Sequence, residues 1–309
     1  LRESAELLGL SADEVIQGGF RIYTAYDARL QTIADEVYAD SSFFPAAASD
    51  GTPIQSAMAV VDTNNGAVLA MIGGRDYTVR RGLNRATQMR RQPGSALKPL
   101  AVYGPALELG YTTASVLLDE KTSFGGYTPR NAGDRYYGLV TMRTAIRNSL
   151  NTTAVRLLEE IGLDASIQYL NKMGIPTRNS DRNLSLALGS MTYGVTPVEL
   201  AAAYVPYANG GIYHQPYCVE RIETVDGSNI YERKDSGKQV LSAQNAFLMT
   251  SLLQSVVSSG TGTRMLAANT PIAGKTGTVS MTGGNRDIWM TAYTPEISVA
   301  VWMGYDQIG

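Results

Sequence analysis

The sequence contains a single cysteine, Cys218, and a single histidine, His214, among its 309 residues. One cysteine cannot form an intrachain disulfide, and the two residues together are too few for a structural zinc site. We therefore expect no metal and no cofactor, and we interpret Cys218 as a small packing residue. A Ser-His-Asp triad would have to use His214, but no G-x-S-x-G elbow accompanies it, so we expect an exposed loop or strand histidine.

Strong net charge and long apolar runs are also missing. The net charge of −2 gives no overall attraction to nucleic acid or to an acidic membrane. No run of about 18 apolar residues is present, and the first residues lack the basic start and apolar centre of a signal peptide. As given, the chain is expected to be soluble, although it can be a piece of an anchored protein. Lysine is scarce, with six among 26 basic residues, so each buried lysine is informative.

The first 55 residues are predicted to form a linker or small lobe, followed by a larger domain over 56–309. In the lobe, Leu1–Val15 has the pattern of an amphipathic helix with Ser11 as an internal cap. Phe20–Tyr26 alternates like a strand, and Arg29–Tyr38 again has a helical pattern.

The larger domain begins with two apolar strands and ends with three. Ser56–Asp62 and Ala67–Ile72 are joined by Thr63–Gly66, whose Asn and Gly residues favour a hairpin turn. The last strands are Pro271–Val279, Asp287–Thr294 and Ile297–Gly304. The helices expected between them are Ala96–Leu109, Thr141–Ile161, Asp164–Met173, Pro197–Asn209 and Ser242–Ser259. This order predicts an α+β fold in which helices sandwich one five-stranded antiparallel sheet.

Ser95 and Lys98 stand three residues apart at a predicted helix start, directly after the breaker pair Pro93-Gly94. At that spacing both side chains share one face, with about 5–6 Å between their Cβ atoms. A lysine can accept a serine proton when burial and a neighbouring positive charge destabilise its ammonium form. Chance supplies about half an S-x-x-K occurrence in such a chain, so the pair alone is a weak signal.

Ser149 and Asn151 lie where one helical pattern ends and another begins. A hydroxyl at Ser149 can relay a proton between Lys98 and a leaving amine, and the Asn151 amide can orient a substrate amide. The alternative is that these residues only cap a helix, a role that serine and asparagine favour.

Lys275-Thr276-Gly277-Thr278 lies inside an apolar strand. Gly277 allows a ligand backbone to approach closely, and a strand edge can pair with an extended peptide. Thr276 and Thr278 offer hydroxyls to a substrate carboxylate. A lysine on a solvated strand edge is the alternative, but K-T-G arises by chance in only about one such sequence in twenty.

In this order the three elements match the established signature of penicillin-binding proteins and class A β-lactamases. The chain resembles most closely the transpeptidase domain of the bifunctional, class A penicillin-binding proteins. The resemblance extends over about residues 20–306. Outside the motifs it is carried by NRATQMRRQPGSALKP at 84–99, PRN at 129–131, GLV at 138–140, and residues 187–211 and 289–306.

The resemblance implies a β-lactamase/transpeptidase-like fold and a serine D,D-transpeptidase that cross-links peptidoglycan stem peptides. In such an enzyme Ser95 attacks the D-Ala-D-Ala carbonyl, and the N–H groups of Ser95 and Thr278 form the oxyanion hole. β-Lactams acylate and inhibit the same serine. It assigns catalytic roles to Ser95, Lys98, Ser149 and Lys275, and substrate binding to Asn151, Thr276, Gly277 and Thr278.

The same resemblance implies action on the extracytoplasmic face of a bacterial membrane, in the periplasm or at the cell surface. Members carry a membrane anchor and a glycosyltransferase domain ahead of this region, and we find neither motif set in the sequence. Other cell-wall synthesis proteins are possible partners. Members also continue into a C-terminal helix that covers the sheet, so we expect an apolar sheet face to be bare in a chain that stops at Gly309.

Three other interpretations of the sequence stay open. A D,D-carboxypeptidase or a β-lactamase would use water in place of the acceptor amine. Against a β-lactamase, no E-x-x-L-N segment lies between the second and third motifs to supply a deacylating carboxylate. A β-lactam sensor domain that is acylated without cross-linking would keep the same serine and lysine. Six arginines between Arg75 and Arg91 suit a polyanion patch, but a solvated loop with structural ion pairs is favoured.

Overall fold

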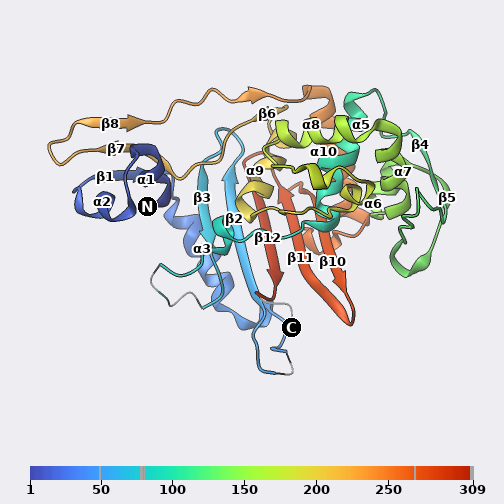
Figure 1. Ribbon diagram of the computed structural model, residues 1–309, viewed down its shortest axis with the longest axis horizontal. Coiled ribbons are helices and arrows are strands. Elements are labelled where there is room, and N and C mark those ends of the chain that lie inside the picture. Colours follow the sequence, from blue (N-terminus) through green and yellow to red (C-terminus); the bar gives the residue numbers. More distant parts are fainter. Residues whose placement is uncertain (49, 77–78, 80, 268, 307–309) are drawn as a thin grey trace.

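The computed structural model describes residues 1–48, 50–76, 79, 81–267 and 269–306. A five-stranded antiparallel sheet of order β10-β11-β12-β2-β3 runs through the centre of the molecule (Figure 1). Its strands are β2 (Gln55–Asp62), β3 (Val68–Ile72), β10 (Ala273–Met281), β11 (Gly284–Tyr293) and β12 (Ile297–Gly304). The early and late strands meet where β2 pairs with β12, which confirms the predicted α+β fold. The predicted end of the domain at Gly309 lies outside the described residues.

One face of the sheet packs on the helices α9 (Pro197–Ala208) and α10 (Ala243–Ser259). Side chains along β12 alternate between buried and half-buried, as expected for a strand with one face in the core. The buried Ser298 hydroxyl donates to the Ala201 carbonyl of α9 at 2.7 Å, and Thr250 of α10 bonds the Tyr293 hydroxyl at 2.9 Å. On β11, Ile288 and Met290 point the other way and are about two-fifths exposed, at 41% and 37%.

The remaining helices and short strands surround this core. They are α4 (Arg85–Gln88), α5 (Gly104–Glu108), α6 (Met142–Arg147), α7 (Asn151–Ile161), α8 (Leu163–Lys172), β4 (Val116–Asp119), β5 (Gly138–Thr141), β6 (Ile212–Tyr213) and β9 (Lys238–Gln239). Short turns are η1 (Ser41–Phe43), η4 (Ala132–Asp134), η5 (Asn179–Asp181), η6 (Leu184–Leu188) and η7 (Thr263–Met265). None of the helices in the described ranges is both long and apolar enough to cross a membrane.

The prediction of one α-helix over Ala96–Leu109 is wrong, because only the last part of this segment is α-helical. The segment is a 3₁₀ turn, η2 (Gly94–Leu97), then a π turn, η3 (Pro99–Tyr103), and only then the α-helix α5. Irregular winding changes which carbonyls find helical partners. The buried hydroxyls of Tyr204 and Tyr207 on α9 donate to the carbonyls of Ala96 and Pro99 at 2.6 and 2.9 Å, which stabilises the irregular turns.

The N-terminal segment is built from two short helices, not the single helix predicted over Leu1–Val15. The first, α1 (Arg2–Leu8), ends at Gly9 in the left-handed conformation, and α2 (Ala12–Gln17) begins with Ser11 in a capping box, as its position suggested. The strand β1 (Arg21–Thr24) pairs with β7 (Val219–Glu223), and β7 pairs with β8 (Asn229–Glu232). Neither β7 nor β8 was predicted from the sequence. The strand β1, which pairs with β7, lies some two hundred residues earlier in the chain, so no local pattern links the two.

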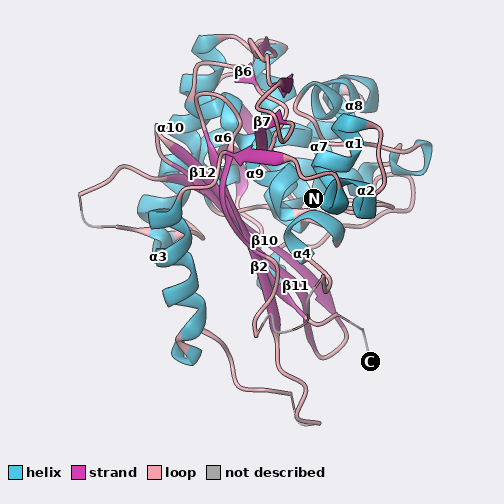
Figure 2. Ribbon diagram, turned by 90° about the vertical axis from the view of Figure 1, so that its left-hand side faces the viewer, coloured by secondary structure: helices cyan, strands magenta, loops and turns pink. Residues whose placement is uncertain are grey.

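The helix α3 (Ala28–Ala39) lies beside the edge strand β3, and in Figure 2 the strands stand between α3 and the helices α7 and α8. The side-chain amide of Gln31 accepts from the Met71 N–H and donates to the Met71 carbonyl, both at 3.0 Å. Asp27 N–H donates to the Leu69 carbonyl at 2.8 Å. This contact therefore pairs the outer backbone groups of β3 as a neighbouring strand would.

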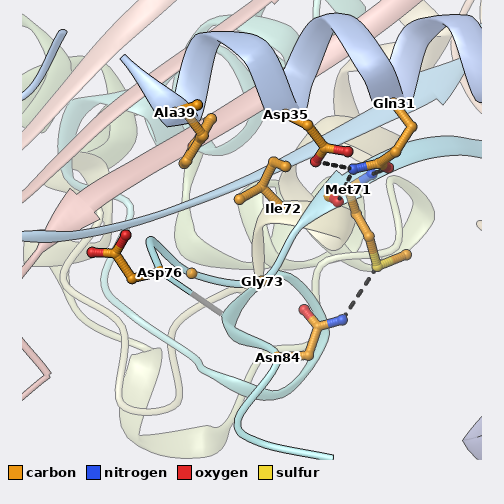
Figure 3. A pocket seen from close by; sticks show the side chains of 10 residues that line it. Gln31, Asp35, Ala39, Met71, Ile72, Gly73, Asp76 and Asn84 are labelled. Atoms are coloured by element: carbon orange, nitrogen blue, oxygen red, sulfur yellow. Dashed lines mark hydrogen bonds between the residues drawn. The ribbon is translucent and has the colours of Figure 1, made fainter. Parts of the chain in front are cut away.

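A hollow of about 510 Å³ opens beside the Gln31 contact, between α3 and residues 71–76 (Figure 3). Asp35 bonds the Gln31 amide at 2.9 Å, and the Asn84 amide points toward the Met71 sulfur at 3.3 Å. The hollow is at the opposite edge of the sheet from β10. It holds none of the residues that the sequence singled out for chemistry.

The arginines between Arg75 and Arg91 mainly make structural contacts, as favoured from the sequence; Arg80 lies outside the described residues. Arg75 stacks over the Phe44 ring and bonds the Ile54 carbonyl, so it joins the N-terminal segment to the sheet. The others form ion pairs: Arg81 with Asp13, Arg85 with Asp306, Arg90 with Glu199, and Arg91 with Asp287.

We expect Gln31→Leu to lower the free energy of unfolding by about 1–2 kcal/mol, because both Met71 backbone groups lose their partner. Chemical denaturation measures this change, and Glu36→Ala at an exposed position of the same helix is the control. An unchanged stability in Gln31→Leu would show that water replaces the amide at no cost.

Candidate active site

Ser95 lies on the 3₁₀ turn η2, which packs against the edge strand β10. Gly94 has a φ of 56°, and a Cβ there would meet the Thr278 carbonyl oxygen at 2.5 Å. A Cβ on Gly277 would meet the Pro93 carbonyl oxygen at 2.3 Å. Both glycines are therefore needed for β10 to approach the turn, and they bring the Thr278 backbone next to Ser95.

Lys98 directly follows the same turn, with its N–H bonded to the Ser95 carbonyl, and is completely buried. Because side chains at i and i+3 eclipse in a 3₁₀ turn, the two residues share a face even though the predicted α-helix start is absent. The Lys98 Nζ donates to the carbonyls of Ser149 and Leu150, at 2.7 and 3.1 Å, and to Asn151 Oδ1 at 2.6 Å. Among the described residues the Ser95 hydroxyl makes no hydrogen bond. Catalytic hydrogen bonds often tighten only once substrate is present.

Ser149 stands in a break between α6 and α7, at the point where the sequence indicated that one helical pattern ends and another begins. Its φ of 54° places it in the left-handed region, which a residue with a side chain adopts at a cost. The break turns the Ser149 hydroxyl toward two lysines: Lys98 Nζ lies 3.3 Å from Oγ, and Lys275 Nζ lies 2.9 Å from it. Strain at Ser149 is thus the cost of placing one hydroxyl between two amines.

Lys275 comes from the edge strand β10 and is completely buried, so the alternative of a solvated edge lysine is wrong. Its Nζ donates to the Thr276 carbonyl at 3.0 Å as well as to Ser149. Lys98, Ser149 and Lys275, predicted from three separate motifs, are therefore brought together at one point of the fold, and Ser95 lies on the turn that leads into Lys98 and packs against β10.

Burial lowers the pKa of both lysines. The pKa of Lys98 lies well below its ordinary value because the side chain is desolvated and because the Lys275 ammonium is near, while the Asp119 carboxylate acts in the opposite direction. Desolvation lowers the pKa of Lys275 to about 7. Both lowered pKa values favour the neutral amine, which is the form of a lysine that can accept a proton.

The residues predicted to bind substrate lie around the same point, but they differ in whether their polar atoms already have hydrogen-bond partners. The Thr278 side chain is exposed and makes no hydrogen bond with the described residues, whereas the Thr276 hydroxyl donates to Thr261 Oγ1 at 3.1 Å. Gly277 is buried against η2. The Asn151 amide uses its oxygen on Lys98 and its nitrogen on the Arg130 carbonyl, so both of its ends are already engaged.

Asp119, a fully buried carboxylate at the end of β4, was not predicted from the sequence. It accepts hydrogen bonds from the Asn131 amide at 2.8 Å, from the Tyr137 N–H at 2.9 Å and from the Thr152 hydroxyl. Asn131 Oδ1 in turn accepts the Asn151 N–H at 2.7 Å, at the first residue of α7. Asp119 therefore fixes the helix end that presents Asn151 to Lys98, and no spacing in the sequence links it to the motifs.

His214 and Cys218 take no part in this cluster. His214 is buried, not exposed as predicted, and its Nδ1 lies 3.1 Å from Asp235 Oδ2. Burial and the Glu3 carboxylate raise the pKa of the half-buried Cys218 thiol to about 12, which suits a packing residue. In the part of the chain that the structure describes, no group of three or more His, Cys, Asp or Glu side chains is arranged to hold a metal ion.

Replacing Lys275 with a methionine of similar length should stabilise the fold while removing a charged group. A lysine whose pKa is lowered by folding binds fewer protons in the folded protein, so its penalty is full below about pH 7 and declines as the pH rises. We expect Lys275→Met to raise the free energy of unfolding by about 1–4 kcal/mol at acidic pH, and by less in the alkaline range.

Denaturant titrations at about pH 6 and about pH 9 measure the difference in unfolding free energy between Lys275→Met and the wild-type protein. Lys121→Met, at an exposed lysine, is the control for loss of a charge from the surface. A difference in unfolding free energy of the same size at both pH values would contradict the lowered pKa of Lys275.

Comparison with known proteins agrees with this geometry. Residues 56–308 match the family model of the penicillin binding protein transpeptidase domain. The chain is 42% identical over 313 residues to penicillin-binding protein 1F of Bacillus subtilis, covering 99% of this chain and 42% of that protein. It is 36% identical to penicillin-binding protein 1A of Clostridium botulinum, covering 94% of this chain and 37% of that protein. The chain thus spans less than half the length of these relatives.

Solved structures give the same result. The penicillin-binding protein PonA1 from Mycobacterium tuberculosis superposes with a TM-score of 0.86 at 26% identity, covering 98% of this chain and 80% of that one. The structure of PonA1 in complex with penicillin V superposes with a TM-score of 0.83. With its motifs gathered at one site and its sheet order in place, the chain belongs to the transpeptidase-domain family of the penicillin-binding proteins.

Proposed function

We propose that the chain is the serine D,D-transpeptidase domain of a class A penicillin-binding protein and that it cross-links peptidoglycan stem peptides through an acyl-enzyme at Ser95. The observation that supports this most directly is the shared hydroxyl of Ser149, which lies within hydrogen-bond reach of two buried lysines of lowered pKa. An amine base of this kind can take the proton of a serine without any histidine.

In the acylation step, the neutral Nζ of Lys98 takes the proton of Ser95 Oγ as Oγ attacks the carbonyl carbon of the penultimate D-Ala. The N–H groups of Ser95 and Thr278 stabilise the oxyanion, a role that the close packing of Gly94 on Thr278 supports. The C–N bond then breaks, and the amine of the terminal D-Ala leaves with a proton delivered through Ser149.

The donor peptide lies along the free edge of β10, where an extended chain can add as a further strand. Its terminal carboxylate meets the exposed Thr278 hydroxyl and the Thr276 hydroxyl, with Lys275 contributing positive charge. In the second step the amine of a neighbouring stem peptide attacks the ester, passes its proton to the same base, and releases Ser95.

The full-length protein then acts on the extracytoplasmic face of the membrane, in the periplasm or at the cell surface, with a membrane anchor, a glycosyltransferase domain and other cell-wall synthesis proteins as partners. This part of the proposal is supported by the short share that the chain covers of penicillin-binding proteins 1F and 1A. β-Lactams mimic the D-Ala-D-Ala terminus and acylate Ser95, and no cofactor is needed for either step.

Intact-mass spectrometry after a short incubation with benzylpenicillin tests this proposal. We expect one added penicilloyl group that persists, and we expect Ser95→Ala to abolish it because Ser95 is the serine of the turn that precedes Lys98 and packs against β10. Ser236→Ala, at an exposed serine outside the site, is the control. Labelling retained in Ser95→Ala would identify another nucleophile, and rapid loss of the adduct with turnover of penicillin would indicate a β-lactamase.

A further inference from the structure

We propose that the hollow beyond Ser149 binds the peptide arm of the acceptor stem peptide and that Arg135 pairs there with a carboxylate of that arm. This inference rests on the proposed transpeptidase function and names a substrate contact that this function leaves open. The hollow has a volume of about 330 Å³. It is lined by Asn131, Ala132, Arg135, Tyr137, Asn148–Leu150 and Ser259–Thr261.

The position of the hollow relative to the reacting groups suits an acceptor. The leaving amine receives its proton through Ser149, so by microscopic reversibility the attacking amine must reach the same hydroxyl. Ser149 is the residue that the hollow shares with the cluster of Lys98 and Lys275. The donor peptide occupies the edge of β10, and the space on the other side of Ser149 is left for a second peptide.

The walls of the hollow are held in place by backbone contacts. Thr261 N–H donates to the Arg147 carbonyl at 3.2 Å, and a Cβ on Gly260 would meet that carbonyl at 2.4 Å. The Thr261 hydroxyl accepts from Thr276 on β10 at 3.1 Å. On the opposite wall, Asn131 and the Tyr137 N–H are tied to Asp119. The hollow is therefore a preformed feature with a size at the low end for small ligands.

The charges at the hollow favour an anion. Arg135 is the one charged side chain in its lining, and within the described ranges its guanidinium makes no hydrogen bond or ion pair. The Asn148 amide is likewise without a partner among the described residues. The neighbouring Asp134 carboxylate bonds the Tyr136 hydroxyl at 2.7 Å, and no carboxylate is among the residues that line the hollow.

A free guanidinium and a free amide that line one hollow are suited to a carboxylate, which arginine binds in a bidentate geometry. The carboxylate of a small acceptor such as D-alanine would lie where the leaving D-Ala had its own, at Thr276 and Thr278. A stem peptide also has a carboxylate on its peptide arm, which is farther from the attacking amine than the carboxylate of D-alanine is. Only this peptide-arm carboxylate reaches Arg135. The proposed contact therefore distinguishes stem peptides from small amines.

The test measures how the acyl-enzyme divides between hydrolysis and transfer to an amine. The protein is acylated with an acyl-D-alanyl thioester donor, and the acceptors are Nα-acetylated Lys-D-Ala or diaminopimelyl-D-Ala, each with a free C-terminal carboxylate or as its carboxamide. D-Alanine is the small acceptor. The variants are then assayed with the acceptor peptide, Lys or diaminopimelyl, that the wild-type protein uses.

We expect Arg135→Gln to lower the transfer-to-hydrolysis ratio by about fivefold for the carboxylate peptide, the size typical of one exposed ion pair. The ratio for the carboxamide peptide and for D-alanine should stay within error of wild type. Arg264→Gln, at an exposed arginine without an ion pair among the described residues, controls for the loss of one positive charge. Equal losses for all acceptors, or no loss for any, would overturn the assignment of Arg135.

These outcomes separate the two proposals. If the wild-type protein is acylated at Ser95 but transfers to no amine, the transpeptidase function fails and the acceptor contact fails with it. If the wild-type protein transfers normally and Arg135→Gln behaves as wild type with the carboxylate peptide, only the acceptor contact is wrong.

Discussion

The architecture of this domain depends on excluding water from two lysines whose amines lie on either side of the Ser149 hydroxyl. Lys98 and Lys275 are both completely buried, and desolvating an ammonium group costs about 5 kcal/mol unless the group gives up its proton. Lowered pKa values are the result, and in the proposed mechanism they supply the base that His214 does not. Stability is therefore given up locally in exchange for chemistry.

Much of the surrounding structure serves to hold that unfavourable arrangement. The break between α6 and α7 leaves Ser149 at a positive φ, and the carbonyls exposed by the break accept from Lys98. Asp119 secures the start of α7 through Asn131. Gly94 and Gly277 let β10 approach closely enough to bring Lys275 to the same point. The buried tyrosines of α9 support the irregular turns that carry Ser95 and Lys98.

The sequence predicted the sheet well, because strand alternation is a strong local pattern, and its motifs named two lysines and a serine that lie together in the structure. Strand alternation and the hairpin at Thr63–Gly66 were sufficient to predict the five strands, and three motifs pointed to one site. The 3₁₀ and π winding around Ser95 was not predictable, since tertiary contacts there override a helical pattern. The change of helix at Ser149 was predicted, but its left-handed φ was not. The same limit applies to Asp119, whose role depends on partners 12 and 33 positions away, and to His214, whose burial depends on Asp235.

The lowered pKa values of the two lysines can be measured directly. With only six lysines in the chain, ¹³Cε NMR of a lysine-labelled sample resolves each side chain, and Lys98→Arg and Lys275→Arg assign the two buried ones. We predict that Lys275 titrates near pH 7 and that Lys98 titrates well below the ordinary range for lysine, each in a curve shaped by the other. Titration of both buried lysines at the ordinary value of about 10.4 would contradict the central role of their burial.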